Sequence, residues 1–102
     1  KMDRYENVGR SHTNYIITCS FRQNSWEISK RYSEFAELQN SIKRKQKLSA
    51  VLPPKKIFGN FSESFILRRQ KALNDYLQAV KREISDFDLL LNFLGSPDIT
   101  SR

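Results

Sequence analysis

The sequence predicts an α+β domain in which strands occupy the first third of the chain and helices the remainder. Three patterns support this class. Apolar and polar residues alternate between Thr13 and Ser29, apolar residues recur at helical spacing between Ile66 and Ile84, and a double proline at Pro53-Pro54 interrupts the helical part. With 102 residues, the chain is long enough for one small domain.

Two strands form a predicted hairpin. Residues 13–21 read TNYIITCSF, and their period-two alternation predicts one buried face made of Tyr15, Ile17, Cys19 and Phe21. Turn-prone residues at 22–25 precede a second alternating run at 26–29, so we expect the two runs to pair. A first strand is expected around residues 4–8, where the alternation is too short to define its register.

The first predicted helix begins near Ser33, which is a suitable capping residue. Phe35, Leu38 and Ile42 follow at helical spacing, and the segment runs into the basic residues 43–47. Cations are favourable at this end of a helix because its carbonyl groups carry negative partial charge. The double proline then ends any helix, and a loop is expected through Asn60.

A longer helix is predicted to begin at Ser62 or Ser64. In a helical projection, Arg69 lies at the edge of its apolar face, whereas the neighbouring Arg68 points away. A cation at the edge of a core requires an anionic partner. A short last helix at Phe87–Leu94 should end at Gly95. The apolar face of the longer helix contains Ile66, Leu73, Leu77, Val80 and Ile84.

Basic residues are concentrated in the middle of the chain. The whole chain carries 18 Lys+Arg and 11 Asp+Glu, a formal charge of +7, while the stretch from Lys30 to Lys71 alone carries +8. A local positive field predicts a phosphoinositide, an anionic membrane or a nucleic acid as partner. A solvated basic face without a ligand is the alternative.

Several classes of function lack support in the sequence. No apolar stretch approaches the roughly 20 residues of a spanning helix. One cysteine, Cys19, and one histidine, His12, predict neither an internal disulfide nor a metal centre, and three glycines form no nucleotide-binding loop. No set of nucleophile, acid and base is present, so we expect no enzyme and no cofactor. Because Lys1 precedes Met2, we expect a domain cut from a longer protein.

Three basic clusters follow one another at the ends of predicted elements. Residues 30–35 read KRYSEF, residues 52–60 read LPPKKIFGN, and Arg69 stands four residues before Leu73. In this order the motifs resemble the PX (phox homology) domain, a phosphoinositide-binding module, over roughly residues 5–94. The resemblance implies an α+β fold with a three-stranded antiparallel sheet packed against a helical subdomain, and one PX domain over residues 1–102.

The resemblance also implies roles for four headgroup-binding residues. Arg31 would grip the 3-phosphate of the inositol ring, for which a planar guanidinium is well suited, and Tyr32 would form the floor beneath the ring. Lys55 would reach the 1-phosphate that joins headgroup to lipid. Arg69 would clasp the 4- and 5-hydroxyls and exclude lipids that carry phosphates there.

Four further residues are expected to help. Lys30 and Lys56 would add positive charge beside the pocket, and Ile57 and Phe58 would enter the membrane interface. For Tyr32, and for Phe58 together with Phe61, an ordinary packing role is the alternative interpretation.

The sequence therefore predicts a non-enzymatic module. From the cytoplasm, it would recruit its parent protein to endosomal membranes by binding phosphatidylinositol 3-phosphate. The first alternative is a PX-fold protein-interaction module with weak or no lipid specificity and an unidentified partner. The second alternative is a nucleic-acid-binding domain, in which the basic stripe with Tyr32, Trp26 and Phe58 would bind single strands. Nucleic acid is not the expected partner.

Overall fold

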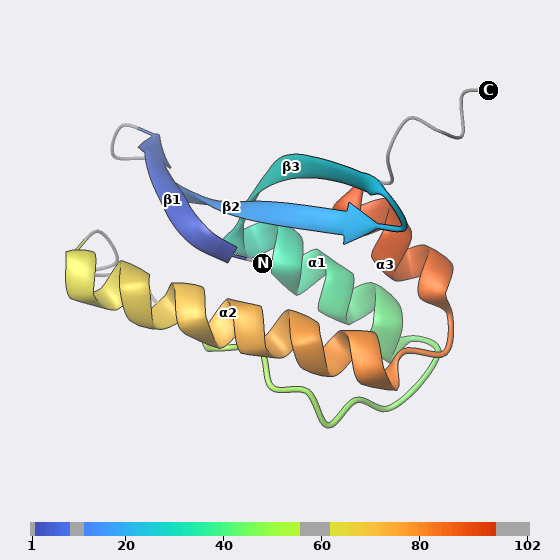
Figure 1. Cartoon of the computed structure of the whole chain (residues 1–102). Coiled ribbons are helices and arrows are strands. Elements are labelled where there is room, and N and C mark those ends of the chain that lie inside the picture. The colour runs from blue at the N-terminus through green and yellow to red at the C-terminus, as the bar shows by residue number, and fades with distance from the viewer. Residues whose placement is uncertain (1, 9–11, 56–61, 96–102) are drawn as a thin grey trace.

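Three strands precede three helices, as predicted. The structure is a computed structural model and describes residues 2–8, 12–55 and 62–95. The strands form one antiparallel sheet in the order β1-β2-β3, and the helices lie against one side of it (Figure 1). This confirms the α+β class. The elements are β1 (Met2–Val8), β2 (His12–Phe21), β3 (Asn24–Arg31), α1 (Tyr32–Lys43), α2 (Glu63–Glu83) and α3 (Phe87–Leu94).

The β2–β3 hairpin differs from its prediction at the tip. Phe21 pairs with Asn24, so the turn contains only two residues rather than the four predicted, and Arg22 adopts a left-handed φ of 59°. Such a turn suits the twist of paired strands. Tyr15, Ile17 and Cys19 are buried as predicted, but Phe21 is 39% exposed because it lies at the tip of the hairpin.

The helix ends follow local hydrogen bonding. The cap of α1 is Arg31 instead of the predicted Ser33: the backbone N–H of Arg31 donates to Glu34 Oε1 at 2.9 Å, which fixes the start of the helix. At α2, Ser62 accepts a hydrogen bond from the Phe65 backbone N–H, as one of the two predicted caps. Helix α3 has its predicted bounds, and Gly95 ends it with a φ of 60°.

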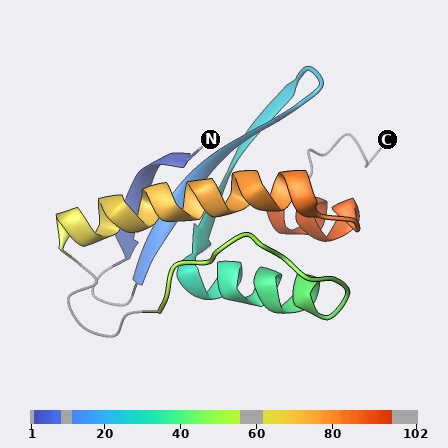
Figure 2. The same ribbon diagram turned by 90° about the horizontal axis from the view of Figure 1, so that it is seen from below.

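The core lies between the sheet and the helices, with α2 crossing beneath the strands (Figure 2). The predicted apolar face of α2 is buried from Ile66 to Val80, whereas Ile84 is the half-buried C-terminal cap. Phe35 of α1 and Phe93 of α3 meet edge to face, with ring centres 5.1 Å apart. In the part of the chain that the structure describes, no helix has the length and hydrophobicity needed to cross a bilayer.

After α1, residues 44–55 run back along the helices (Figure 2). Ser49 donates to Glu83 through its backbone N–H at 2.8 Å and through its hydroxyl at 2.7 Å, and Lys45 forms a 2.7 Å ion pair with Asp86. The Ser49 hydrogen bonds lower the pKa of Glu83. These bonds hold the segment against the C-terminal end of α2 and direct Pro53 and Pro54 toward the start of α1.

Candidate functional site

Arg69 is a buried cation enclosed by two aromatic rings. Its side chain is 8% exposed, and its Cζ lies 4.2 Å from the ring centre of Tyr32 and 4.7 Å from that of Phe65. These distances are within the range of a cation–π interaction. The structure confirms that the helical face of α2 carries Arg69 inward, as its spacing predicted.

Backbone oxygens of the double proline complete the surroundings of Arg69. Its Nη2 donates to the carbonyl oxygen of Pro54 at 2.9 Å, and the hydroxyl of Tyr32 donates to that of Pro53 at 2.6 Å. A proline residue has a backbone carbonyl but no backbone N–H, so each proline here can act only as an acceptor. The two bonds tie the proline segment to the first turn of α1 and to α2.

The guanidinium of Arg69 has no carboxylate partner within the described residues. Burial lowers the pKa of Arg69, while neighbouring Tyr15 and Tyr32 oppose this shift. An arginine keeps its charge under such conditions because its usual pKa lies far above neutral pH. The guanidinium has five N–H groups and makes a single hydrogen bond, to Pro54, within the described residues. Its Nε is buried without a partner in this part of the chain. The guanidinium thus carries a charge that no described carboxylate neutralises.

A cavity of about 420 Å³ opens beside this guanidinium. The described residues that line it include three basic side chains and no acidic one. Lys55 and Arg68 are exposed, so they place charge at the rim, while Arg69 lies deeper. Arg68 was predicted to point away from the core, and it does, but the structure also places it at this cavity. The lining residues are Pro53, Pro54, Lys55, Phe65, Arg68, Arg69 and Ala72.

Arg31 is next to the site in the sequence. It is the last residue of β3 and directly precedes Tyr32, whose ring lies under Arg69. Its backbone is fixed by the hydrogen bond to Glu34, and its side chain is exposed. Arg31 and Tyr32 are both absent from the described lining of the cavity. Of the four predicted headgroup residues, Lys55 and Arg69 line it, and Tyr32 is joined to them through its ring contact with Arg69.

Of the four auxiliary residues, only Lys30 lies within the described residues. Lys30 packs over the Phe93 ring at 4.9 Å and lies 3.7 Å from Glu34 Oε2, so its ammonium is directed to α1 and α3 and does not line the cavity. Lys56, Ile57 and Phe58 lie outside the described residues.

Phe65 is the residue that sequence reasoning missed. It covers the side of Arg69 at 4.7 Å and also lines the cavity. The signal was present, because residues four apart in a helix lie on the same face and Phe65 is four residues before Arg69. Among the described residues, no group of three or more His, Cys, Asp or Glu side chains is placed to hold a metal ion.

Known proteins resemble this chain in sequence and in fold. The PX domain family model matches residues 18–97. The PX domain-containing protein kinase-like protein of Rattus norvegicus is 43% identical over 90 residues, covering 83% of this chain and 15% of that protein. Serine/threonine-protein kinase Sgk3 of the same organism is 34% identical over 82 residues, covering 78% of this chain and 16% of the kinase.

The chain thus corresponds to a small part of each relative. Among solved structures, the X-ray structure of a designed CISK-PX domain superimposes with a TM-score of 0.76 at 28% identity, covering 91% of this chain and 92% of that one. These matches confirm the resemblance inferred from the three basic motifs. The chain belongs to the PX domain family, whose members generally bind phosphoinositides and recruit proteins to membranes.

Proposed function

We propose that this domain binds phosphatidylinositol 3-phosphate and so recruits its parent protein, without catalysis, to the cytoplasmic face of endosomal membranes. The observation that carries the proposal is the buried guanidinium of Arg69, which lacks a carboxylate partner in the described chain and lies beside a cavity lined with further cations. A buried cation is stable only when an opposite charge or strong acceptors compensate for lost water.

The proposal gives each of the four headgroup-binding residues a role, and Lys55 and Arg69 line the cavity. Tyr32 supplies a ring held rigidly by its hydrogen bond to Pro53, and a flat ring is a suitable floor for the inositol. Lys55 is exposed at the cavity rim, where the phosphodiester of a membrane lipid would pass. Arg69 donates to the 4- and 5-hydroxyls from within, and Arg31 binds the 3-phosphate.

The rigidity of Arg69 supports selectivity for the 3-monophosphate. Two rings and the Pro54 carbonyl hold the guanidinium in one position, so it cannot readily move aside for a 4- or 5-phosphate. A phosphate there would gain charge attraction but would have to displace these contacts. Selectivity by exclusion follows from that competition.

Vesicle binding near physiological salt tests the function. Each phosphoinositide isomer is compared with phosphatidylserine at matched surface charge, because matching removes general electrostatic attraction as an explanation. We expect the 3-phosphate isomer to bind most tightly. We also expect Arg31→Ala to weaken binding by about 30- to 160-fold, which corresponds to roughly 2–3 kcal/mol for a charge-assisted phosphate contact.

Arg82→Ala is the matched control because Arg82 is exposed at the far end of α2 and lies outside the cavity. Thermal unfolding establishes that both variants fold. Equal binding of all charged vesicles, or full binding by folded Arg31→Ala, would refute the proposal. Pocket-independent targeting would then favour a protein-interaction module, and tight binding of single strands would favour nucleic acid.

A further inference from the structure

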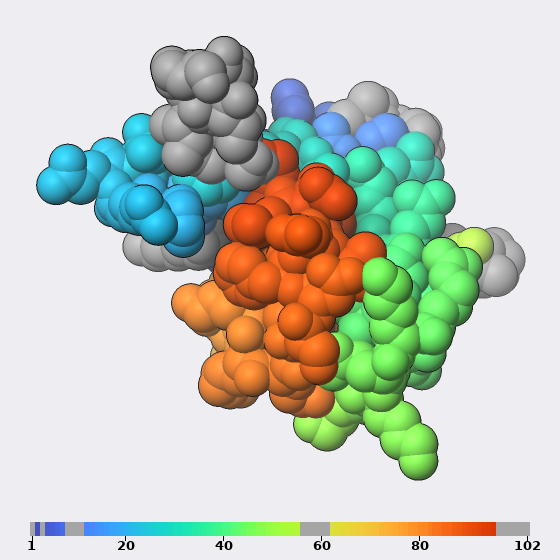
Figure 3. Space-filling model, turned by 90° about the vertical axis from the view of Figure 1, so that its right-hand side faces the viewer, coloured from blue at the N-terminus to red at the C-terminus, as the bar shows by residue number. Residues whose placement is uncertain are grey.

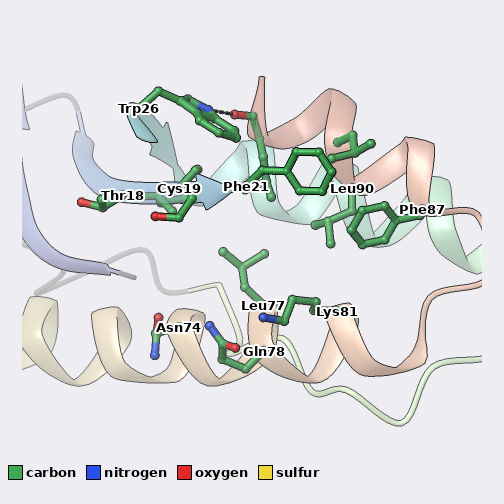
Figure 4. A pocket seen from close by; sticks show the side chains of 14 residues that line it. Thr18, Cys19, Phe21, Trp26, Asn74, Leu77, Gln78, Lys81, Phe87 and Leu90 are labelled. Carbon is green, nitrogen blue, oxygen red and sulfur yellow. Dashed lines mark hydrogen bonds between the residues drawn. The ribbon is translucent and has the colours of Figure 1, made fainter. Parts of the chain in front are cut away.

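A second cavity lies toward the C-terminal end of α2. Its volume is about 270 Å³, and side chains of the β2–β3 hairpin, α2 and α3 surround it (Figure 4). Cys19, Leu77 and Leu90 contribute buried apolar surface to its wall. Lys81 at this cavity is twelve residues beyond Arg69 in the same helix, which separates the two positions by roughly 18 Å along the axis.

The rim of this cavity carries exposed aromatic side chains. Phe21 at the hairpin tip is 39% exposed and Phe87 at the start of α3 is 41% exposed, and both line the cavity. The indole N–H of Trp26 donates to the Leu94 carbonyl at 2.8 Å, which fixes the ring as part of the wall. The hairpin tip and α3 lie at the same end of the molecule (Figure 3). Exposed aromatic groups around a preformed apolar hollow are typical of a docking surface.

The charge at this cavity has one sign. Of the lining residues that the structure describes, Lys81 alone is charged, and none of the described carboxylates forms an ion pair with it. The amide side chain of Gln78 lies beside Lys81 on α2, and that of Asn74 lines the cavity further toward the start of the helix (Figure 4). An apolar hollow with one ammonium group and two amides complements an apolar group that carries a carboxylate.

We propose that this cavity docks a short segment of a protein partner, one that presents a large apolar side chain next to an Asp or Glu. The choice of protein over lipid rests on the proposed function: if the Arg69 end of α2 meets the bilayer, the cavity at its other end lies away from it. The domain would then hold a headgroup and a protein segment at the same time.

Selection from a displayed library of random twelve-residue peptides tests the proposal. Peptides are selected on the parent domain and counter-selected on the double variant Phe21→Ser/Lys81→Glu. A selected peptide is then titrated while the fluorescence of Trp26 is followed, because Trp26 is the single tryptophan of the chain and lines the cavity.

We expect the selected peptides to share a large apolar residue beside Asp or Glu and to change Trp26 emission saturably. Lys81→Glu should weaken binding by about tenfold or more, and replacing the acidic residue of the peptide with Lys should restore binding to this variant. Arg82→Glu is the matched control for charge, because Arg82 is adjacent in α2 and does not line the cavity. Val51→Ser, at a 78% exposed position elsewhere, is the control for removing an apolar surface group.

Three results would overturn the proposal: selected peptides without an acidic residue, equal loss with Arg82→Glu, or a selection in which no peptide distinguishes the parent from the double variant. Thermal unfolding of each variant excludes misfolding as the cause. The two proposals fail separately. Arg31→Ala should retain peptide binding while it loses vesicle binding, and Lys81→Glu should do the reverse.

Discussion

Replacing Arg69 with Lys tests whether the geometry of the guanidinium matters beyond its charge. The substitution keeps the positive charge in the cavity but removes the planar group that lies between Tyr32 and Phe65. A lysine ammonium is compact and strongly hydrated, so it cannot contact both rings and the Pro54 carbonyl in the same way.

The contacts of Arg69 set the size of the expected effect on binding. A partly desolvated cation–π contact contributes about 0.5–2 kcal/mol, and a hydrogen bond to a carbonyl about 0.5–1.5 kcal/mol. Since lysine retains part of these interactions, we expect headgroup binding to weaken by roughly 1–2 kcal/mol, or about 5- to 30-fold. The free energy of unfolding should fall by about 1 kcal/mol, because the buried ammonium loses more hydration than the guanidinium does.

Calorimetric titration with inositol 1,3-bisphosphate, the soluble headgroup of phosphatidylinositol 3-phosphate, measures the binding term without a membrane. Arg82→Lys is the matched control on the same helix, because Arg82 is exposed and remote from the cavity. If Arg69→Lys bound the headgroup as tightly as the parent, charge alone would explain the site and the argument from the two rings would be wrong.

Two further substitutions test the surroundings of this site. Tyr76→Phe should raise the free energy of unfolding by about 1 kcal/mol at neutral pH, since the Tyr76 hydroxyl is buried without a partner among the described residues; a loss of stability in urea denaturation would contradict this. Burial raises the pKa of Tyr76 from 10.0 to about 12, so its ionisation leaves the stability of the fold unchanged below pH 10 and lowers it by roughly 2–3 kcal/mol as the pH rises through 12. In the same titration Tyr76→Phe should show a smaller alkaline loss than the parent. Tyr32→Phe keeps the ring beneath Arg69 but deletes the bond to Pro53, and we expect it to cost about 1 kcal/mol of stability and to weaken headgroup binding; unchanged thermal unfolding would show that this bond does not hold the proline segment.

Local sequence patterns were sufficient to predict the helices and strands and the inward position of Arg69. Periodicity reports which side of a strand or helix is apolar, and this information is contained in neighbouring residues. The bounds of α3 and the burial of Tyr15, Ile17 and Cys19 therefore agree with prediction. The predicted N-terminal cap of α1 was wrong by two residues, because the Glu34 side chain, and not that of Ser33, makes the hydrogen bond at the start of the helix.

Contacts between distant segments required the tertiary structure. The surroundings of Arg69 come from α1, the proline segment and α2, and no local pattern states which of these groups will meet. The same reason explains why Lys30 lies against Phe93 rather than beside the cavity.

The sequence alone determined that this chain is an α+β domain with a basic centre, PX motifs and a cation on the buried side of α2, because these properties depend on residue type and local spacing. Only the tertiary structure decided which rings and carbonyls enclose Arg69, and that Phe21, Trp26 and Lys81 share a second cavity. Side chains up to 77 residues apart along the chain line this cavity, and their proximity is set by how the helices pack on the sheet.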